Sequence, residues 1–312
     1  MKRPNATVAL SAAFVALVGS VQRPSSLQAQ ETRTTFRTAV ALVPISAVVR
    51  DSRNRIVRNL AQADFHVLEN SQPRRILDFR ATDDASISLA VLLDTSGSMR
   101  GRNWSRGKEV VEELLKWVNR PSDEIALFTF DKGLRQETAF TNDADGIRQA
   151  LDNVDAWGLT SLYDAIAETA KRLAGRRGQR RAVIVITDGA DTSSRLSPPE
   201  VSGLASAIDV PVYAVAVEPS QDPRATVADR DGALTHLAYW TGGGVSHVAA
   251  ADTTRRIAAL MAELRQQYFL AIEADPTSGW HRIDVTTRRR GLTVRARSGY
   301  FATPSGRSDS GE

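Results

Sequence analysis

The sequence predicts an α/β protein with a doubly wound, mostly parallel sheet, helices on both of its faces, and a small flanking β module. Two runs, Ser88–Leu93 and Ala182–Ile186, are almost entirely apolar, as strands buried on both faces of a parallel sheet are. Strand-like and helix-like stretches alternate around these runs, which favours repeated βα units. Residues 31–84 and 268–303 show strand character only, which predicts the β module.

The N-terminal β segment covers residues 31–84. Ala39–Val49 is apolar and rich in β-branched residues, and Asp51–Asn54 after it is a cluster of turn formers. Phe65–Leu68 and Arg75–Phe79 are short runs typical of further strands. No helical period persists in this segment, so we expect strands and turns here.

The α/β region covers residues 85–267. Val110, Leu114 and Val118 share one face of a helical projection, as expected for an amphipathic helix. Besides the two apolar runs, the expected strands are Ile125–Phe130, Val210–Val217 and Val245–Ala249. The expected helices are Trp104–Val118, Ala144–Val154, Ser161–Ala174, one that begins at Ser197 and Pro198, and Thr253–Gln267.

The C-terminal β segment, residues 268–303, contains three expected strands: Tyr268–Glu273, Trp280–Thr286 and Leu292–Ala296. Each β segment alone is too small to be stable, so our hypothesis is that the two pair with each other. Residues 304–312 form a polar tail that we expect to be disordered.

The N-terminus has the pattern of a signal peptide. Lys2 and Arg3 precede an uncharged apolar stretch at 6–21, and small residues follow near Ala29. We therefore expect residues 1–30 to direct export to the periplasm, the cell surface or the medium, with no membrane span after cleavage. An uncleaved signal anchor or a buried strand is the alternative. The chain has no cysteine, which excludes disulfides and a lipid-modified cysteine.

The charge balance is nearly even once the signal segment is set aside. The chain has 40 basic and 36 acidic residues, and residues 1–30 hold three of the basic ones and no acid, which leaves 37 against 36. A nucleic-acid partner requires a concentrated basic face, so this balance argues against one.

Three polar segments follow elements of the predicted sheet. Asp94–Ser98 comes directly after the first apolar strand, Thr187–Gly189 directly after the second, and Gly158–Thr160 precedes an expected helix. Ligands of open parallel sheets bind at the carboxyl ends of the strands, so the topology brings these segments together. The groups offered there are two carboxylates and three hydroxyls, from Asp94, Ser96, Ser98, Thr160 and Asp188.

An all-oxygen set of this kind suits a hard cation. Mg²⁺ is the ion we expect, with Mn²⁺ or Ca²⁺ possible, and the donors argue against zinc or copper. Serine and threonine hydroxyls are neutral, so if they fill several coordination positions the ion stays under-neutralised. A carboxylate from outside is then the natural remaining ligand, which predicts a partner that offers an aspartate or glutamate.

These segments resemble the metal-ion-dependent adhesion site of von Willebrand factor A (VWA) domains, in order and in spacing, over about residues 85–267. The resemblance implies a Rossmann-like VWA fold, direct coordination by Ser96, Ser98 and Thr160, and water-mediated contacts from Asp94 and Asp188. The flanking segments, Asp64–Asn70 and Arg297–Phe301, are similar to those of an acidobacterial group of exported VWA proteins. Leu159 departs from the pattern, since a second glycine is common there.

Other polar features have ordinary structural explanations. The run Thr241–Gly244 precedes a strand and lacks a following Gly-Lys-Ser/Thr, so we expect a tight turn and not a phosphate loop. We expect Asp143, Asp145 and Asp191 in solvated loops. The four histidines are scattered without ligand spacing, so we expect each to be structural or exposed.

Three classes of function compete. The first is a non-enzymatic, metal-dependent module for protein binding or cell adhesion, which captures a partner's carboxylate. The second is a structural role, in which the metal only holds the loops and the β module binds. The third is a Mg²⁺-dependent hydrolase, for which the sequence shows no nucleophile–histidine pair or phosphate loop. Competition by an acidic peptide for the ion would weaken the structural reading.

Overall fold

The computed structural model describes residues 42–81, 85–176, 180–188, 191–207, 209–217, 227–249 and 251–302. The expected signal segment 1–30, the expected tail 304–312, and Gly189 lie outside the described residues. Among the helices that are described, none combines the length and apolar character needed to cross a membrane.

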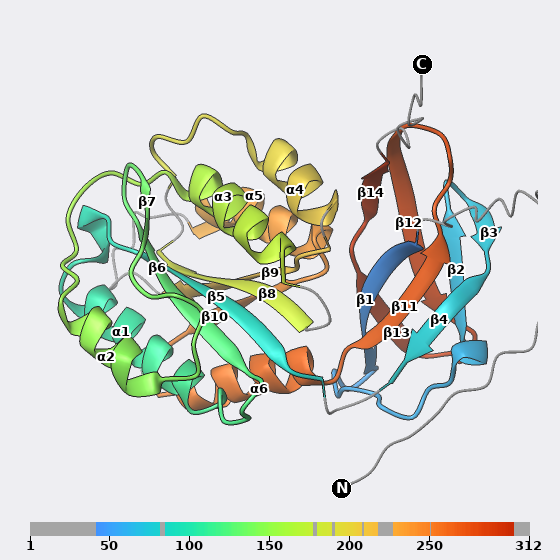
Figure 1. Cartoon of the computed structure of the whole chain (residues 1–312), viewed down its shortest axis with the longest axis horizontal. Coiled ribbons are helices and arrows are strands. Elements are labelled where there is room, and N and C mark those ends of the chain that lie inside the picture. Colours follow the sequence, from blue (N-terminus) through green and yellow to red (C-terminus); the bar gives the residue numbers. More distant parts are fainter. Residues whose placement is uncertain are drawn as a thin grey trace, which may run out of the picture. The chain divides into compact units, whose positions relative to one another are not determined.

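A six-stranded sheet forms the centre of the α/β region, in the order β10-β9-β8-β5-β6-β7 (Figure 1). Its strands are β5 (Ile87–Asp94), β6 (Glu124–Phe130), β7 (Leu134–Gln136), β8 (Arg180–Thr187), β9 (Val212–Val217) and β10 (Gly244–Val248). All pair in parallel except β7, which pairs antiparallel with β6. The prediction of a mostly parallel, doubly wound sheet is confirmed.

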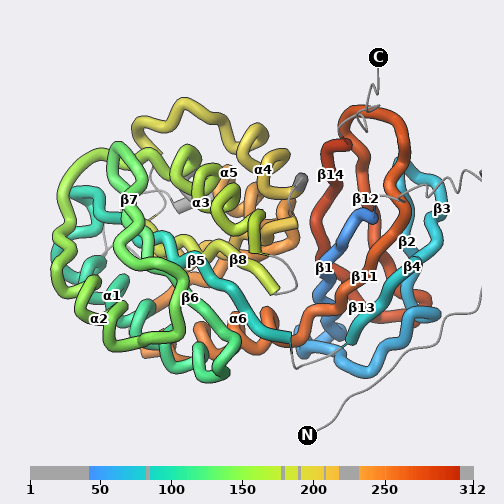
Figure 2. Tube along the Cα trace, viewed as in Figure 1, coloured from blue at the N-terminus to red at the C-terminus, as the bar shows by residue number. Residues whose placement is uncertain are grey.

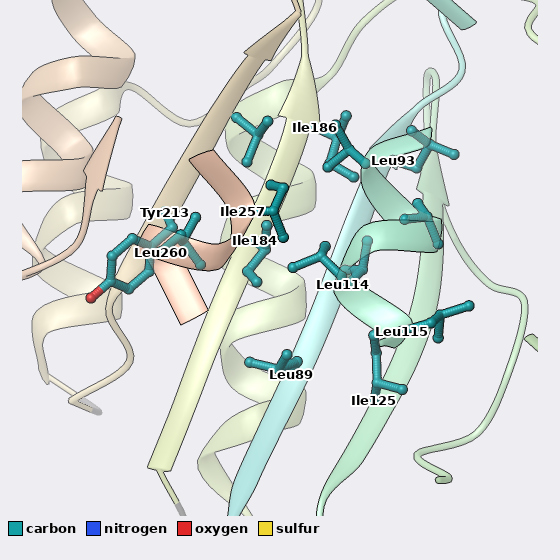
Figure 3. Close-up of a cluster of buried hydrophobic side chains, with 14 of the residues drawn as sticks. Leu89, Leu93, Leu114, Leu115, Ile125, Ile184, Ile186, Tyr213, Ile257 and Leu260 are labelled. Atoms are coloured by element: carbon teal, nitrogen blue, oxygen red, sulfur yellow. The ribbon is translucent and has the colours of Figure 1, made fainter. Parts of the chain in front are cut away.

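Helices cover both faces of this sheet because side chains alternate along the central strands. Leu89 and Leu93 of β5 pack in one buried cluster (Figure 3), and Leu92 packs in another on the opposite face. The first cluster includes α1 (Arg102–Leu115), α2 (Ala144–Asp152) and α6 (Thr253–Arg265); the second includes α3 (Leu162–Ala174), α4 (Pro198–Ala207) and α5 (Val227–Trp240). Burial of each large aliphatic side chain contributes about 1.5–3 kcal/mol to stability.

Two four-stranded antiparallel sheets form a β sandwich, in the orders β13-β1-β11-β4 and β14-β12-β2-β3. The strands are β1 (Leu42–Asp51), β2 (Phe65–Glu69), β3 (Gln72–Arg74), β4 (Ile76–Arg80), β11 (Tyr268–Glu273), β12 (Gly279–Thr287), β13 (Leu292–Ala296) and β14 (Gly299–Ala302). A short 3-10 turn, η1 (Gln62–Asp64), leads into β2. Ile45, Phe65, Tyr268 and Ile283 lie in the shared core.

Both sheets combine strands from the two ends of the described chain, and in the first sheet these strands alternate. β1 lies between β11 and β13, with Ala47 opposite both Tyr268 and Ala296. Figure 2 shows the blue β1 beside the orange and red strands from the other end of the chain. In the second sheet β12 pairs with β2, and Val285 lies opposite Val67. Neither end could complete either sheet without strands from the other.

Four elements were not predicted from the sequence. β3, β7 and β14 have three or four residues each, too few to show a period of two. Helix α5 begins with a charged stretch in the sequence, and Leu234, Leu237 and Ala238 are buried in its second half. The apolar pattern therefore extends over too few residues to indicate a helix on its own.

The glycine run after α5 makes the expected tight turn. Gly242 has a φ of 84°, a conformation that glycine adopts without strain. A Cβ on Gly243 would lie 1.9 Å from the carbonyl oxygen of Val212. Only glycine allows the turn to pass this close to β9.

Candidate metal centre

Backbone hydrogen bonds hold the polar loops together at the carboxyl edge of the sheet. Asp94 is the last residue of β5, and Asp188 follows directly after β8. Beyond Asp94, the N–H of Gly97 donates to the carbonyl of Gly158 at 3.0 Å. The N–H of Trp157 donates to the carbonyl of Thr95 at 2.5 Å. The loop that carries Thr160 is therefore fixed against the loop that carries the serines.

Asp94 is fully buried, and its two carboxylate oxygens face different neighbours. Oδ1 accepts from the N–H of Ser96 at 2.8 Å, and Oδ2 accepts from the hydroxyl of Thr187 at 2.7 Å. Burial, with a smaller contribution from the charge of Asp188, raises the pKa of Asp94 to about 6 against the hydrogen bonds from Thr187 and Ser96 that lower it. The site thus holds more negative charge than its surroundings compensate.

Ser96 and Ser98 present their hydroxyls side by side. The two Oγ atoms lie 3.0 Å apart, with Ser96 buried and Ser98 exposed. The short 3-10 turn η2 (Gly97–Met99) sets this spacing, and Met99 is buried beneath it. The Ser96 hydroxyl therefore lies at the buried side of the site, and the Ser98 hydroxyl lies at its solvent-exposed side.

Thr160 is buried, and its backbone is fixed by a loop that follows β8. Its N–H donates to the hydroxyl of Thr192 at 3.0 Å, and its carbonyl accepts from the N–H of Ser193 at 3.0 Å. Gly158, two residues earlier, has a φ of 132°, and a Cβ there would lie 3.0 Å from the Cβ of Asp131. A glycine is needed for the loop to reach this position.

The hydroxyl-rich stretch 191–194 positions the threonine loop, a role that the sequence did not reveal. Asp191 lies in a loop, as expected, but it is partly buried and accepts from the N–H of Leu162 at 2.8 Å, so it caps α3. Asp143 likewise caps α2, whereas Asp145 is exposed and pairs with Arg148. The run of serines and threonines at 192–194, shortly after Asp188, was the sequence feature that could have indicated this supporting role.

Asp188 has a buried carboxylate oxygen, Oδ1, that finds no hydrogen-bond partner among the described residues. Buried polar atoms are nearly always paired, because an unpaired one costs about 1–3 kcal/mol. An unpaired carboxylate oxygen beside a second carboxylate and two adjacent hydroxyls is a donor set that fits a hard cation. The chemistry of this donor set fits the group that the sequence implied, and Thr160 lies in the loop that is fixed against the serines.

A second acidic cluster, in the sandwich, has a different character. One oxygen or nitrogen each of Glu69, Asp275 and His281 lie within 4.8 Å of one another. The guanidinium of Arg74 forms ion pairs with both Glu69 and Asp275. Glu69 also accepts from the hydroxyl of Tyr300 at 2.5 Å and lies 3.0 Å from Nδ1 of His281. The guanidinium of Arg74 already neutralises the carboxylates of this cluster. The cluster is therefore an ion-pair network within the protein.

Comparisons with known proteins agree with this architecture. Residues 89–190 match the family model for the von Willebrand factor type A domain. A curated relative, an uncharacterized protein from Borreliella burgdorferi, is 25% identical over 145 residues, which cover 44% of this chain and 42% of that protein. The chain thus matches less than half the length of this relative.

Two solved structures are similar to the chain at low sequence identity. BatB from Bacteroides thetaiotaomicron is 18% identical, with 57% of this chain and 97% of that chain covered and a TM-score of 0.48. A von Willebrand factor type A structure from Catenulispora acidiphila is 12% identical, with 83% and 73% covered and a TM-score of 0.49. By its family match and strand order, the α/β region has a VWA-like fold.

Proposed function

We propose that this protein is a metal-dependent protein-binding module, and that Mg²⁺ is held by Asp94, Ser96, Ser98, Thr160 and Asp188. The observation that carries the proposal is the buried Asp188 Oδ1, which has no partner in the described part of the chain. Mn²⁺ or Ca²⁺ would meet the same oxygen donors. When bound, the ion supplies Lewis acidity toward an incoming oxygen ligand.

The remaining coordination position suits a carboxylate from a partner protein. Five protein ligands leave one position of the octahedral shell that Mg²⁺ prefers, and the direct ligands that the resemblance implies, Ser96, Ser98 and Thr160, are neutral hydroxyls. Ser98 is exposed, which leaves the site open to an outside ligand. The VWA-like fold supports a role in protein interaction, and the metal-dependent capture of a carboxylate is our refinement of that role.

The rim of the proposed site carries residue types that contribute strongly to interfaces. Trp157 is 72% exposed and Leu159 is 47% exposed, both in the loop before Thr160. The guanidinium of Arg100 lies 4.2 Å from the centre of the Trp157 ring. Tryptophan and arginine are enriched in binding hot spots, so we propose that this pair contacts the partner beside its carboxylate.

Calorimetric titration of Mg²⁺, Mn²⁺ and Ca²⁺ into the purified protein tests the site itself. We expect one ion per chain, and no binding to a Ser96→Ala, Ser98→Ala variant. Ser105→Ala removes an exposed hydroxyl from α1 and serves as the matched control. Equal binding by the double variant and the control would refute the ligand assignment.

The partner is tested separately, by retention of proteins from the producing cell on the immobilised chain. We expect retention in Mg²⁺, its loss in EDTA and in the double-serine variant, and competition by an acidic peptide. Metal binding with no exchangeable carboxylate would instead support the structural role, in which the ion only holds the loops.

We also propose a division of the chain and a location. Residues 1–30 serve as a signal peptide, 85–267 as the VWA domain, and 31–84 with 268–303 as one β module. Sequencing of the N-terminus of the protein recovered from periplasm, cell surface and medium tests export, with a new terminus near residue 31 as the expected result.

A further inference from the structure

A hollow of about 540 Å³ lies where β9, β10 and α6 meet β1 and β13. It is separate from the proposed metal centre, since none of the five proposed ligands lines it. Its lining includes three arginines and two tyrosines: Arg50, Arg256, Arg295, Tyr213 and Tyr239.

The charges around the hollow do not balance. Glu263, whose side chain is 4% exposed, forms ion pairs with both Arg50 and Arg295. One carboxylate shared by two guanidinium groups leaves a positive charge. The other acidic residue of the lining, Asp51, pairs with Arg55 at 2.7 Å.

Arg256 adds a third guanidinium to the same lining. Its Nε donates to Asp252 at 2.9 Å. The Nη atoms of Arg256 have no partner among the residues that the structure describes. They are thus available as donors, and the hollow has the charge of an anion site.

Arg295 is held in place before any ligand arrives. Its Nε donates to the carbonyl of Gly242 at 3.3 Å, and its guanidinium lies 5.9 Å from the ring centres of Tyr213 and Tyr239. A Cβ on Gly244 would lie 3.0 Å from Nη1 of Arg295, so the glycine leaves room for the guanidinium. A donor fixed in this way loses little conformational entropy on binding.

The hollow also has apolar surface. Tyr239 is half exposed, and Leu260 and Val48 line the hollow with it. Tyr213 and Leu260 belong to the buried cluster on the α6 face of the sheet (Figure 3). A ligand seated here would contact rigid side chains as well as the arginines.

We propose that this hollow binds a small organic oxyanion, a phosphate or carboxylate that carries an apolar group. The oxyanion accepts charge-assisted hydrogen bonds from Arg256 and Arg295, and the apolar group packs against Tyr239 and Leu260. The site does not depend on a metal ion, so it differs in chemistry from the proposed function.

Binding of three probes to the whole protein in EDTA tests this proposal: inorganic phosphate, phenyl phosphate and benzoate. We expect phenyl phosphate to bind more tightly than inorganic phosphate by calorimetry, and to raise the unfolding temperature. Tighter binding of benzoate than of phenyl phosphate would assign the site to carboxylates, and the reverse would assign it to phosphates.

Two variants and a matched control locate the binding. Arg256→Gln should weaken phenyl phosphate binding about ten-fold, the usual effect of one lost charge-assisted hydrogen bond. Arg295→Gln should weaken it at least as much. Arg255→Gln removes a neighbouring arginine of α6 that pairs with the same Asp252 but does not line the hollow, and should leave binding unchanged.

Arg256 does not contact Glu263 in the described structure, so its variant tests the site even if Arg295→Gln disturbs the fold. No binding of any probe at millimolar concentration would overturn the proposal. Equal affinity in the Arg255→Gln and Arg256→Gln proteins would also overturn it, because binding would then lie elsewhere.

Discussion

The protein contains two clusters of acidic side chains that differ in how their charge is compensated. In the sandwich, Glu69 and Asp275 share the guanidinium of Arg74. At the carboxyl edge of the α/β sheet, Asp94 and Asp188 lie close enough for the charge of Asp188 to raise the pKa of Asp94. No arginine or lysine is paired with either of these two in the described part of the chain.

This difference separates a structural network from the proposed metal centre. A buried carboxylate that meets an arginine, a tyrosine hydroxyl and a histidine has its charge neutralised by the fold itself. A buried carboxylate oxygen without such partners is the group that we propose binds a cation from outside. Removal of charge should therefore have opposite effects in the two clusters.

The largest expected effect is on the sandwich. Arg74→Met leaves the fully buried side chain of Glu69 without its cation, and should lower the free energy of unfolding by about 3 kcal/mol, at the low end of the usual range because Arg74 is partly exposed. Urea denaturation measures it. Arg80→Met, which breaks an exposed pair with Asp78, is the control and should cost less than about 1 kcal/mol.

The double variant Glu69→Gln, Arg74→Met should recover part of that loss, since no buried charge then remains unpaired. Equal losses of stability in Arg74→Met and Arg80→Met would show that the buried ion-pair network does not stabilise the sandwich more than an exposed ion pair does.

The next largest effect concerns the proposed metal centre, where removal of a charge should not lower the free energy of unfolding in the absence of metal. Asp188→Asn should leave the unfolding free energy in EDTA unchanged or slightly higher, because the repulsion with Asp94 is removed. In Mg²⁺ at 100 times its Kd, the unaltered protein should gain about 2.7 kcal/mol and the variant nothing. Urea denaturation with EDTA and with Mg²⁺ measures both.

Asp145→Asn, at an exposed position on α2, is the matched control and should keep the full gain from Mg²⁺. A clear loss of stability of Asp188→Asn in EDTA would show that Asp188 has a structural partner.

A smaller effect concerns the rim of the metal centre. Trp157→Ala should leave Mg²⁺ affinity unchanged, because the proposed ligands are other side chains and the backbone N–H of residue 157 is kept. It should weaken Mg²⁺-dependent retention of a partner by about 2 kcal/mol or more, as for an interface hot spot. Leu77→Ala, an exposed apolar residue on β4, should weaken neither.

The smallest expected effect is on the stability of the protein at low pH. Hydrogen bonds from Thr277, and then Arg74, lower the pKa of Asp275 from 3.8 to about 2. A lowered pKa in the folded state means that Asp275 stabilises the protein above about pH 4 and loses this contribution as the pH falls toward 2. Denaturation at pH 5 and pH 3 should show a smaller acid loss in Asp275→Asn than in the unaltered protein.

Much of the α/β region could be predicted from the sequence. β5 and β8 are buried on both faces, so their residues are apolar almost without interruption. The polar segments after them stand out for the same reason. The segment 191–194 was missed as a support for Thr160, because hydrogen bonds to a loop some thirty residues away leave no local pattern.

The sandwich was predicted only in outline. Pairing of the two β segments was a hypothesis based on their size, and the structure adds β3 and β14 and the register of β1 between β11 and β13. His281 looked like one of four scattered histidines, yet it is buried beside Glu69. Contacts between residues about 200 positions apart cannot be derived from either segment alone.

By itself, the sequence determined most strands and helices of the α/β region and the side chains offered at the carboxyl edge of the sheet. It did so because burial imposes a periodicity and because strand ends place their next residues at a common edge. Only the tertiary structure decided which charges are compensated. Arg74 neutralises one acidic cluster, Glu263 lies between two arginines, and Asp188 Oδ1 is left without a described partner, since pairing of charges depends on distances that the chain sets only when folded.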